Sequence, residues 1–387
     1  MQSERALLII LIVILQGIGL VMIYDSSAIY ANEAPEIHDS DFFIKRQAMW
    51  MGLGVLALAV LSVADYRVLV RSALPIFGVS VLSLGMVFVP GIGVKANESY
   101  RWIRLGGKVL QPSEFAKVAT ILFLAHTLMR NPWHGRQGKD PLTFKKLLIP
   151  LGGVGACAGL ILLEPNFSST AVIGSLTFIV LFAAGTKLRY LFCLVAGSAA
   201  VLGYKVYTSS YQLGRIAAFL DPAQHQSGVA YQQTQSLLAL GTGGLFGMGL
   251  GSGRQKLGFL PYLYNDFVAA SIGEQAGFVG MCALISFYVL FVVVGFRIAV
   301  RAKHQEGYLV AVGVSSLIGI QAVLHMGVVA SLFPATGLNL PFVSFGGSSL
   351  FVSLFLTGLL ISVSRVAERE PVKEGARALR AGSVITT

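Results

Sequence analysis

Long apolar runs recur from one end of the chain to the other and constrain its fold more than any other feature. A run of roughly 17 to 25 apolar residues crosses the hydrocarbon core of a bilayer as an α-helix. Because 55% of the residues are hydrophobic and only 12% are charged, the chain has more apolar surface than one globular core needs. We therefore predict an all-α polytopic membrane protein. Its ten predicted spans cover residues 6–24, 47–64, 73–93, 113–129, 147–163, 168–185, 190–206, 267–296, 307–332 and 347–364.

The Lys and Arg residues predict how these spans are oriented. Cytoplasmic loops of membrane proteins carry an excess of Lys and Arg, and placing Arg5 inside puts most of the 29 basic residues on the cytoplasmic side. The even number of spans then places both termini in the cytoplasm. The inner basic positions are Arg67, Arg71, Arg130, Arg136, Lys139, Lys145, Lys146, Lys187, Arg189, Arg297, Arg301, Lys303, Arg365, Arg369, Lys373, Arg377 and Arg380.

The net charge of +11 therefore reflects topology, and nothing separate indicates a nucleic-acid partner. Residues 1–366 form the predicted membrane domain, and residues 367–387 form a basic cytoplasmic tail. The long outer loop 207–265 between spans 7 and 8 contains the apolar, glycine-rich stretch SLLALGTGGLFGMGLGSG. A loop of this length and composition is expected to fold back onto the outer face of the membrane.

Several Lys and Arg residues lie in predicted outer loops, against the excess of positive charge expected on the cytoplasmic side. Their presence there needs another explanation. Arg101 lies in YRWIRLGGKVLQPSEFAK, and Arg215, Arg254 and Lys256 lie in the long outer loop. Attraction to lipid headgroups is one interpretation of each residue. Two loops that both combine Arg or Lys with Gly and aromatic residues favour a site for an anionic ligand. Arg offers a planar fork that matches phosphate oxygens, and Lys offers a compact charge.

Glu114 and Lys117 stand one helical turn apart at the outer edge of a predicted span, where Pro112 suits the first turn of a helix. They form either an intrahelical ion pair or part of a polar cavity, since ionisable residues in spans are candidates for function. Glu164 before Pro165 is similarly either a turn residue or a cavity carboxylate.

Asp266 stands at the start of the almost uncharged helix in NDFVAASIGEQAGFVG. A carboxylate at this place either caps the helix, where it satisfies free N–H groups and the helix dipole, or takes part in chemistry. On the predicted topology it faces the outside, directly after the loop that supplies Arg254 and Lys256.

Several long motifs, in order along the chain, resemble the SEDS family of shape, elongation, division and sporulation proteins, typified by RodA and FtsW. The segment GSGRQKLGFLP favours the FtsW branch. The resemblance implies a glycosyltransferase that polymerises lipid II into peptidoglycan at the outer face of the bacterial cytoplasmic membrane. It also implies a class B penicillin-binding protein as transpeptidase partner, together with other membrane proteins of division or elongation. The motifs are GLVMIYDSSAIYA, FFIKRQAMW, RWIRLGGKVLQPSEFAK, LEPNFSSTAV, QSLLALGTGGLFGMGLGSGRQKLGFLP, DFVAASIGEQAGFVG and PATGLNLPFVSFGGSSL.

The resemblance implies a catalytic role for Asp266 and functional importance for Trp102 and Glu114. The chain departs from the usual pattern before Asp266: family members commonly have Pro-Glu followed by His-Thr-Asp, whereas here Pro261 leads to Tyr262, Leu263, Tyr264 and Asn265. The usual Glu-Glu pair further along is Glu274 with Gln275, and His325 replaces a common Asn. A mechanism that needs the missing Glu or His is therefore in doubt.

Joining two lipid II molecules requires a base for a sugar hydroxyl and a stabiliser for the pyrophosphate leaving group. Asp266 is the predicted base, with its pKa raised by burial among Phe267, Phe259 and Tyr264. The anion is met by Arg or Lys, by a divalent cation such as Mg²⁺ or Mn²⁺, or by both, and no organic cofactor is expected. The candidate cations are Arg101, Lys117, Arg215, Arg254 and Lys256.

Other small or polar residues carry weaker hypotheses. Ser344 and Gly346 lie at the outer mouth of the last span, where they either let substrate approach the backbone or allow close helix packing. Glu274 lies too far along its helix to share the proton transfer, and His325 is expected to be a hydrogen-bonded structural residue.

Two other functions compete with the polymerase. A transporter that flips lipid II would suit ten spans, but it needs polar groups at several depths, whereas the candidates here cluster on one side. A scaffold that positions other cell-wall enzymes would tolerate the loss of Asp266.

Overall fold

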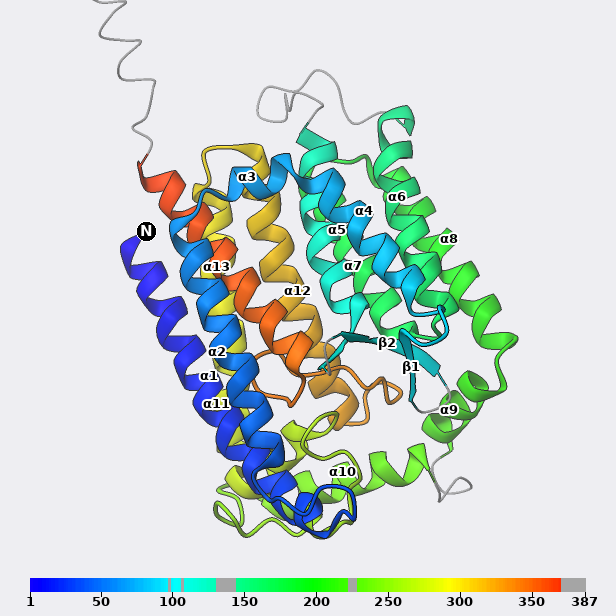
Figure 1. The fold of residues 1–387 in the computed structure, drawn as a ribbon, viewed down its shortest axis with the longest axis vertical. Helices are drawn as coiled ribbons and strands as arrows, with labels where there is room; N and C mark the ends of the chain where they lie inside the picture. Colours follow the sequence, from blue (N-terminus) through cyan, green and yellow to red (C-terminus); the bar gives the residue numbers. More distant parts are fainter. Residues whose placement is uncertain (97–98, 106–107, 130–143, 222–227, 370–387) are drawn as a thin grey trace, which may run out of the picture.

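The computed structural model describes residues 1–96, 99–105, 108–129, 144–221 and 228–369. Most of the predicted inner loop 130–146 and of the tail 367–387 lies outside these ranges, including Arg130, Arg136 and Lys139. Within them the chain forms a bundle of long helices, with a small sheet and two shorter helices at one end (Figure 1).

Each predicted span coincides with a helix. Seven of the described helices are long and apolar enough to cross a membrane; α4 and α7 are apolar but shorter, and α5 carries charged residues in its first turns. The chain is therefore a multi-pass helical protein, while the count of ten spans stays a prediction. These helices are α1 (Gln2–Glu33), α2 (Phe42–Val63), α4 (Ala73–Met86), α5 (Pro112–Met129), α6 (Phe144–Leu163), α7 (Phe167–Ala183), α8 (Leu188–Tyr207), α11 (Val268–Arg301), α12 (Gln305–Val329) and α13 (Gly347–Arg369).

The centre of the bundle is formed by α12 and α13, most of whose apolar residues are buried. Helix α13 packs closely along α2 because small residues let the two backbones approach. A Cβ atom on Gly358 would lie 2.9 Å from Cα of Leu58. Side chains on the outer helices point away from this core instead, as for Phe192, which is 75% exposed. Such apolar outer surfaces are typical of helices that face lipid.

The two ends of the bundle differ. One end carries the chain start, α3 (Tyr66–Arg71) and the last turn of α13, joined by the ion pairs Arg5–Glu368 and Arg67–Glu306 (Figure 1). The predicted cytoplasmic cations of the described residues gather at this end. The start of α1 and the end of α13 therefore lie together, as an even number of spans requires. We call the opposite end the loop end.

The loop end departs from a purely helical design. Strands β1 (Gly93–Ala96), β2 (Ser99–Leu105) and β3 (Lys108–Leu110) form an antiparallel sheet in that order, where an outer loop was expected. Gly93 pairs with Ile103, and Ile103 with Leu110. Tyr, Trp and Ile are residues that favour strands, and SYRWIRL contains all three, with Ile103 buried against the bundle.

In its described residues, the predicted outer loop 207–265 packs against the bundle, and its place on the outer face of the membrane stays a prediction. It forms α9 (Ser210–Leu220), α10 (Val229–Gly243) and the short helix η1 (Gln255–Leu257), which lie at the loop end (Figure 1). The Ser236 hydroxyl of α10 donates to the Val329 carbonyl at the end of α12 at 2.8 Å. This contact fastens the loop to the central helices.

Candidate active site

Asp266 lies at the end of a tight turn that leads into α11. Its backbone N–H donates to the Tyr262 carbonyl at 3.0 Å, and Tyr262 has a positive φ of 58°, which is uncommon for a residue with a side chain. Helix α11 begins at Val268 after Phe267, and no side chain caps it. The helix-cap interpretation of Asp266 is therefore wrong, because its carboxylate does not bind the first N–H groups.

The Asp266 carboxylate is partly buried and faces two arginines. Burial raises its pKa to about 6, and the guanidinium groups of Arg215 and then Arg101 act in the opposite direction. None of the described residues donates a hydrogen bond to the carboxylate. An acid with a pKa this close to neutral is able to hold or release a proton under physiological conditions.

The connection 330–346 between α12 and α13 lies beside Asp266. A Cβ atom on Gly337 would lie 3.4 Å from Oδ2 of Asp266, and Gly337 has a φ of 63°. Four elements hold this connection through its backbone carbonyls, which fixes its path. The donors are Arg215 of α9 to Ala335 at 3.0 Å, Ser168 of α7 to Thr336 at 2.7 Å and Gln233 of α10 to Phe333 at 3.0 Å, while Nδ1 of His325 lies 2.7 Å from the Leu338 carbonyl. The prediction that His325 is hydrogen-bonded within the fold is confirmed.

Arg101 reaches the site from β2. Its Nε donates to the Glu164 carbonyl at 3.2 Å and its Nη2 to the Pro165 carbonyl at 2.7 Å, in the turn between α6 and α7. The Glu164 side chain is fully buried, and neither of its carboxyl oxygens has a hydrogen-bond partner in the part of the chain that the structure describes. Burial raises the Glu164 pKa to about 8, against the effect of Arg101. One guanidinium therefore influences two carboxyl groups.

Three of the predicted cations lie elsewhere. Lys117 is fully buried, and its Nζ lies 2.6 Å from the Glu114 carboxylate, which is the predicted intrahelical pair. The Arg254 side chain is exposed, and Lys256 forms an ion pair with Asp25 of α1 at 2.5 Å. Of the five candidates, the structure brings Arg101 and Arg215 to Asp266.

Three aromatic side chains were predicted around Asp266. Phe267 is buried, whereas Phe259 is 49% exposed. Tyr264 is close enough for the Asp266 charge to act on it, and its ring packs against Phe43 at a centroid distance of 4.5 Å. That all three rings together bury Asp266 stays a prediction.

The small residues near α13 make close contacts within the fold. The Leu340 N–H donates to Oγ of Ser344 at 2.8 Å, and the Ser344 carbonyl accepts from Gln47 of α2 at 3.3 Å. A Cβ atom on Gly346 would lie 1.8 Å from Nδ2 of Asn339, so a larger residue would require the Asn339 side chain to move. A role of Ser344 and Gly346 in substrate approach stays a prediction. Trp102 pairs with Val94 in the sheet and is partly buried.

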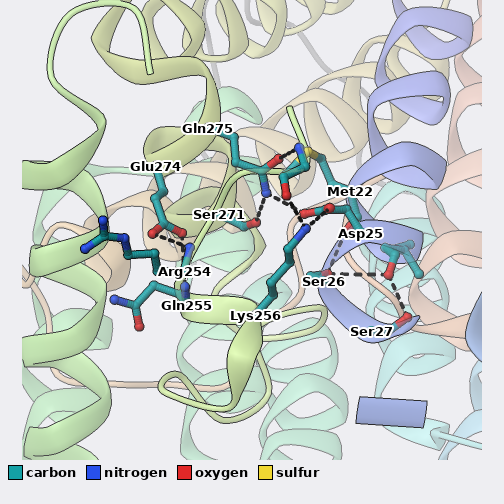
Figure 2. A network of polar contacts seen from close by, with 12 residues as sticks. Met22, Asp25, Ser26, Ser27, Arg254, Gln255, Lys256, Ser271, Glu274 and Gln275 are labelled. Carbon is teal, nitrogen blue, oxygen red and sulfur yellow. Dashed lines mark hydrogen bonds and ion pairs between the residues drawn. The ribbon is translucent and has the colours of Figure 1, made fainter. Parts of the chain in front are cut away.

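Glu274 stands apart from the site, as expected. Its carboxylate accepts backbone N–H groups from Arg254 at 2.8 Å and Gln255 at 3.3 Å (Figure 2). The carboxylate therefore binds the backbone at the start of η1, in the long loop before α11. This polar network holds the loop and leaves Asp266 outside it.

Sequence reasoning did not single out Ser168, Thr336 or Gly337. Gly337 falls in the motif PATG, and its left-handed backbone conformation explains why a glycine stands there. A single sequence does not show which glycines adopt that conformation. Carbonyl acceptors such as that of Thr336 carry no signal in residue type. In the described part of the chain, no three His, Cys, Asp or Glu side chains gather as ligands for a metal ion.

The fold and the site together define a multi-pass membrane protein with a partly buried carboxylate at one end of its bundle, on which the charges of two arginines act. A family model described as a cell cycle protein, covering FtsW, RodA and SpoVE, matches residues 5–369. A probable peptidoglycan glycosyltransferase FtsW of Trichlorobacter lovleyi is 39% identical over 367 residues, 94% of each chain. The stage V sporulation protein E of Bacillus subtilis is 37% identical over 94% of this chain and 97% of its own. The chain belongs to the FtsW, RodA and SpoVE family.

Solved structures agree with this assignment. The rod shape determining protein RodA of Thermus thermophilus superimposes with a TM-score of 0.68 at 27% identity, covering 94% of this chain and 97% of that one. A chain from a peptidoglycan synthase complex, reported for its coordination of polymerization and crosslinking, gives a TM-score of 0.74 at 27% identity, with 94% and 98% covered. The bundle is therefore the fold of this family.

Proposed function

We propose that the protein is a peptidoglycan glycosyltransferase that polymerises lipid II into glycan strands. Membership of the family and the names of its relatives support this reaction. The observation that carries the site assignment is the Asp266 carboxylate, which is partly exposed, lies near Arg215 and Arg101, and has its pKa raised to about 6. This environment suits a general base, because the group is ionised at neutral pH yet takes up a proton readily.

In the proposed reaction, the 4-hydroxyl of the acceptor sugar attacks the anomeric carbon of the donor sugar. A new C–O bond forms at that carbon while its bond to the undecaprenyl pyrophosphate oxygen breaks. The hydroxyl proton passes to Asp266, which later releases it to solvent. Direct displacement inverts the anomeric carbon, so no covalent sugar–enzyme intermediate is needed.

Arg215 and Arg101 provide positive charge for the pyrophosphate that departs. Both are fixed by backbone carbonyls, so their charge is in place before the transition state forms. A Mg²⁺ or Mn²⁺ ion on the pyrophosphate oxygens is the alternative source of charge. With so few protein ligands near Asp266, such an ion would be held mainly by the substrate.

We place this reaction at the outer face of the bacterial cytoplasmic membrane. The positive-inside rule supports that orientation, because the described cytoplasmic cations lie at the end of the bundle opposite to Asp266. The likeness to a chain of a peptidoglycan synthase complex supports a class B penicillin-binding protein as partner. Its transpeptidase would crosslink the strands that this protein makes.

The decisive test is glycan polymerisation from lipid II by the purified protein with its penicillin-binding partner. We expect Asp266→Asn to lower the rate by about 10²- to 10⁴-fold, because the amide cannot accept the proton. Asp39→Asn is the matched control, since Asp39 pairs with Lys45 at an exposed loop and its loss should change the rate less than about twofold.

Retained polymerisation by Asp266→Asn would remove the base assignment. Lipid II flipping in vesicles by the wild type, with no polymerisation, would favour the transporter instead. A scaffold predicts neither activity.

A further inference from the structure

Helix α11 begins at Val268 and is broken nine residues later at Gly277, whose φ of 67° and ψ of −163° are not helical. A break in a buried helix leaves N–H and C=O groups that need partners. Residues 244–249 of the preceding loop enter the break and supply them. The four bonds run from Met248 N–H to Glu274 O at 3.0 Å, Gly249 N–H to Gln275 O at 3.1 Å, Phe278 N–H to Gly244 O at 2.9 Å and Val279 N–H to Leu245 O at 3.1 Å.

The close fit of loop and helix explains the glycines of this loop. A Cβ atom on Gly247 would lie 2.1 Å from the Gln275 carbonyl oxygen, and one on Gly277 would lie 2.3 Å from the Gly247 nitrogen. No larger residue fits at either position without moving a backbone. The loop and residues 268–276 therefore form one packed unit.

Two side chains of residues 268–276 hold the next part of the loop. Glu274 accepts the N–H groups of Arg254 and Gln255, and Oε1 of Gln275 accepts the N–H of Gly251 at 2.8 Å (Figure 2). Both side chains are almost fully buried. Their hydrogen bonds are therefore shielded from competing water.

The same network fastens the unit to α1. Nε2 of Gln275 donates to Oδ2 of Asp25 at 2.5 Å, and Nζ of Lys256 donates to Oδ1 of Asp25 at 2.5 Å and to the Gly251 carbonyl at 2.7 Å (Figure 2). The Lys256 and Asp25 side chains are 13% and 15% exposed. The Asp25 carboxylate thus accepts a hydrogen bond from the Gln275 amide on one oxygen and from the Lys256 ammonium group on the other.

Backbone hydrogen bonds continue from this network to Asp266. The Gln255 carbonyl accepts the Leu260 N–H at 3.2 Å, and the Tyr262 carbonyl accepts the Asp266 N–H at 3.0 Å. The segment therefore begins in the break of α11 and returns to the start of α11, where Asp266 stands. The position of Asp266 therefore depends on how this segment is held both at the break of α11 and at the start of α11.

We propose that Glu274, Gln275 and the Asp25–Lys256 pair are positioning residues for Asp266. They hold residues 244–256 against the first turns of α11 and against α1, and so fix where the carboxylate stands relative to Arg215 and Arg101. This inference rests on the proposed polymerase function.

Gln275→Glu tests the proposal with almost no change of shape. The new carboxylate would face Oδ2 of Asp25, where an amide now donates, so the contact becomes repulsive. With the penicillin-binding partner present, we expect kcat for lipid II polymerisation to fall at least tenfold with little change in KM. The acid limb of the pH–rate profile should also move to higher pH as Asp266 shifts away from Arg215.

Adding Asp25→Asn should restore the network, because an amide at position 25 donates to the new carboxylate while its oxygen still accepts from Lys256. We expect the double variant Asp25→Asn with Gln275→Glu to return kcat to within about threefold of wild type, along with the wild-type pH profile. If the proposed positioning residues served folding alone, variants that remain soluble and folded would keep the wild-type pH–rate profile. Glu306→Gln is the control, because it removes the Arg67–Glu306 pair at the opposite end and should leave kcat unchanged.

A folded Gln275→Glu variant with wild-type kcat and pH profile would overturn the proposal, as would a loss that Asp25→Asn does not restore. If Gln275→Glu does not fold, Glu274→Gln replaces it, since the amide oxygen still accepts one of the two N–H groups. We then expect kcat to fall about threefold or more, and an unchanged kcat would overturn the proposal. A wild type that does not polymerise lipid II would instead contradict the proposed function.

Discussion

Asp266 and Glu274 belong to the same turn-and-helix segment, yet their carboxylates have opposite surroundings. Glu274 is almost fully buried and accepts two backbone N–H groups, so its charge is neutralised by a fixed set of donors. Asp266 is partly exposed and receives no hydrogen bond from the described residues, with Arg215 and Arg101 nearby. A carboxylate that accepts backbone N–H groups holds a structure together, and one that receives no such hydrogen bond is able to accept a proton.

The most direct way to break this comparison is to neutralise each carboxylate in turn and measure unfolding. Glu274→Gln should lower the free energy of unfolding by about 1.5–3 kcal/mol, because hydrogen bonds to a buried charged group are lost. Asp266→Asn should not lower it, since burial disfavours the charge it removes. Thermal or denaturant unfolding of both variants in the same detergent gives the difference, and equal losses would mean that both carboxylates are structural.

A smaller effect is expected when the arginine beside Asp266 loses its charge. Arg215 lowers the Asp266 pKa, so Arg215→Gln should raise it. Because the base must be ionised, the acid limb of polymerisation, expected near pH 6 in the wild type, should move to higher pH. The rate should fall several-fold more at pH 6 than at pH 8. An unshifted limb, measured from kcat/KM against pH, would show that Arg215 does not act on the base.

A third effect concerns Glu164, whose fully buried carboxyl has no hydrogen-bond partner among the described residues. Its pKa is about 8 in the fold against a model-peptide value of 4.5, so ionisation favours the unfolded chain. The free energy of unfolding of the wild type should fall as pH rises from about 4.5 through 8. Glu164→Gln should not show this pH-dependent loss, because it has no carboxyl group to ionise at position 164. Melting temperatures of both proteins at pH 6 and pH 9 measure the gap, which should widen in favour of the variant. A constant gap would mean that Glu164 is solvated or paired.

The sequence was sufficient to predict every long helix, because apolar runs of spanning length have few other solutions. It also led to Asp266 through its motif. It did not show which cations accompany Asp266, and the nearest ones in sequence, Arg254 and Lys256, lie elsewhere. Their place is set by the break at Gly277 and by Asp25, more than 200 residues away from Lys256, as the Asp25–Lys256 ion pair shows. Contacts of this range leave no pattern in a single sequence.

The sheet was likewise missed, because a short amphipathic segment such as SYRWIRL next to glycines is ambiguous between loop and strand. The exposed ring of Phe259 shows a related limit. Neighbours in sequence are not neighbours in space where the chain turns sharply, as it does at Tyr262.

The connection between α12 and α13, which lies beside Asp266, is held by hydrogen bonds to its main-chain carbonyl oxygens. Every amino acid has such an oxygen. The donors Arg215, Ser168 and Gln233 therefore hold the connection between α12 and α13 without regard to most of its side chains. Substitutions at positions of this connection that pack loosely can change what faces the substrate while the frame keeps its shape. The connection is thus a place where recognition of a different sugar or peptide stem can be selected or engineered at little cost in architecture.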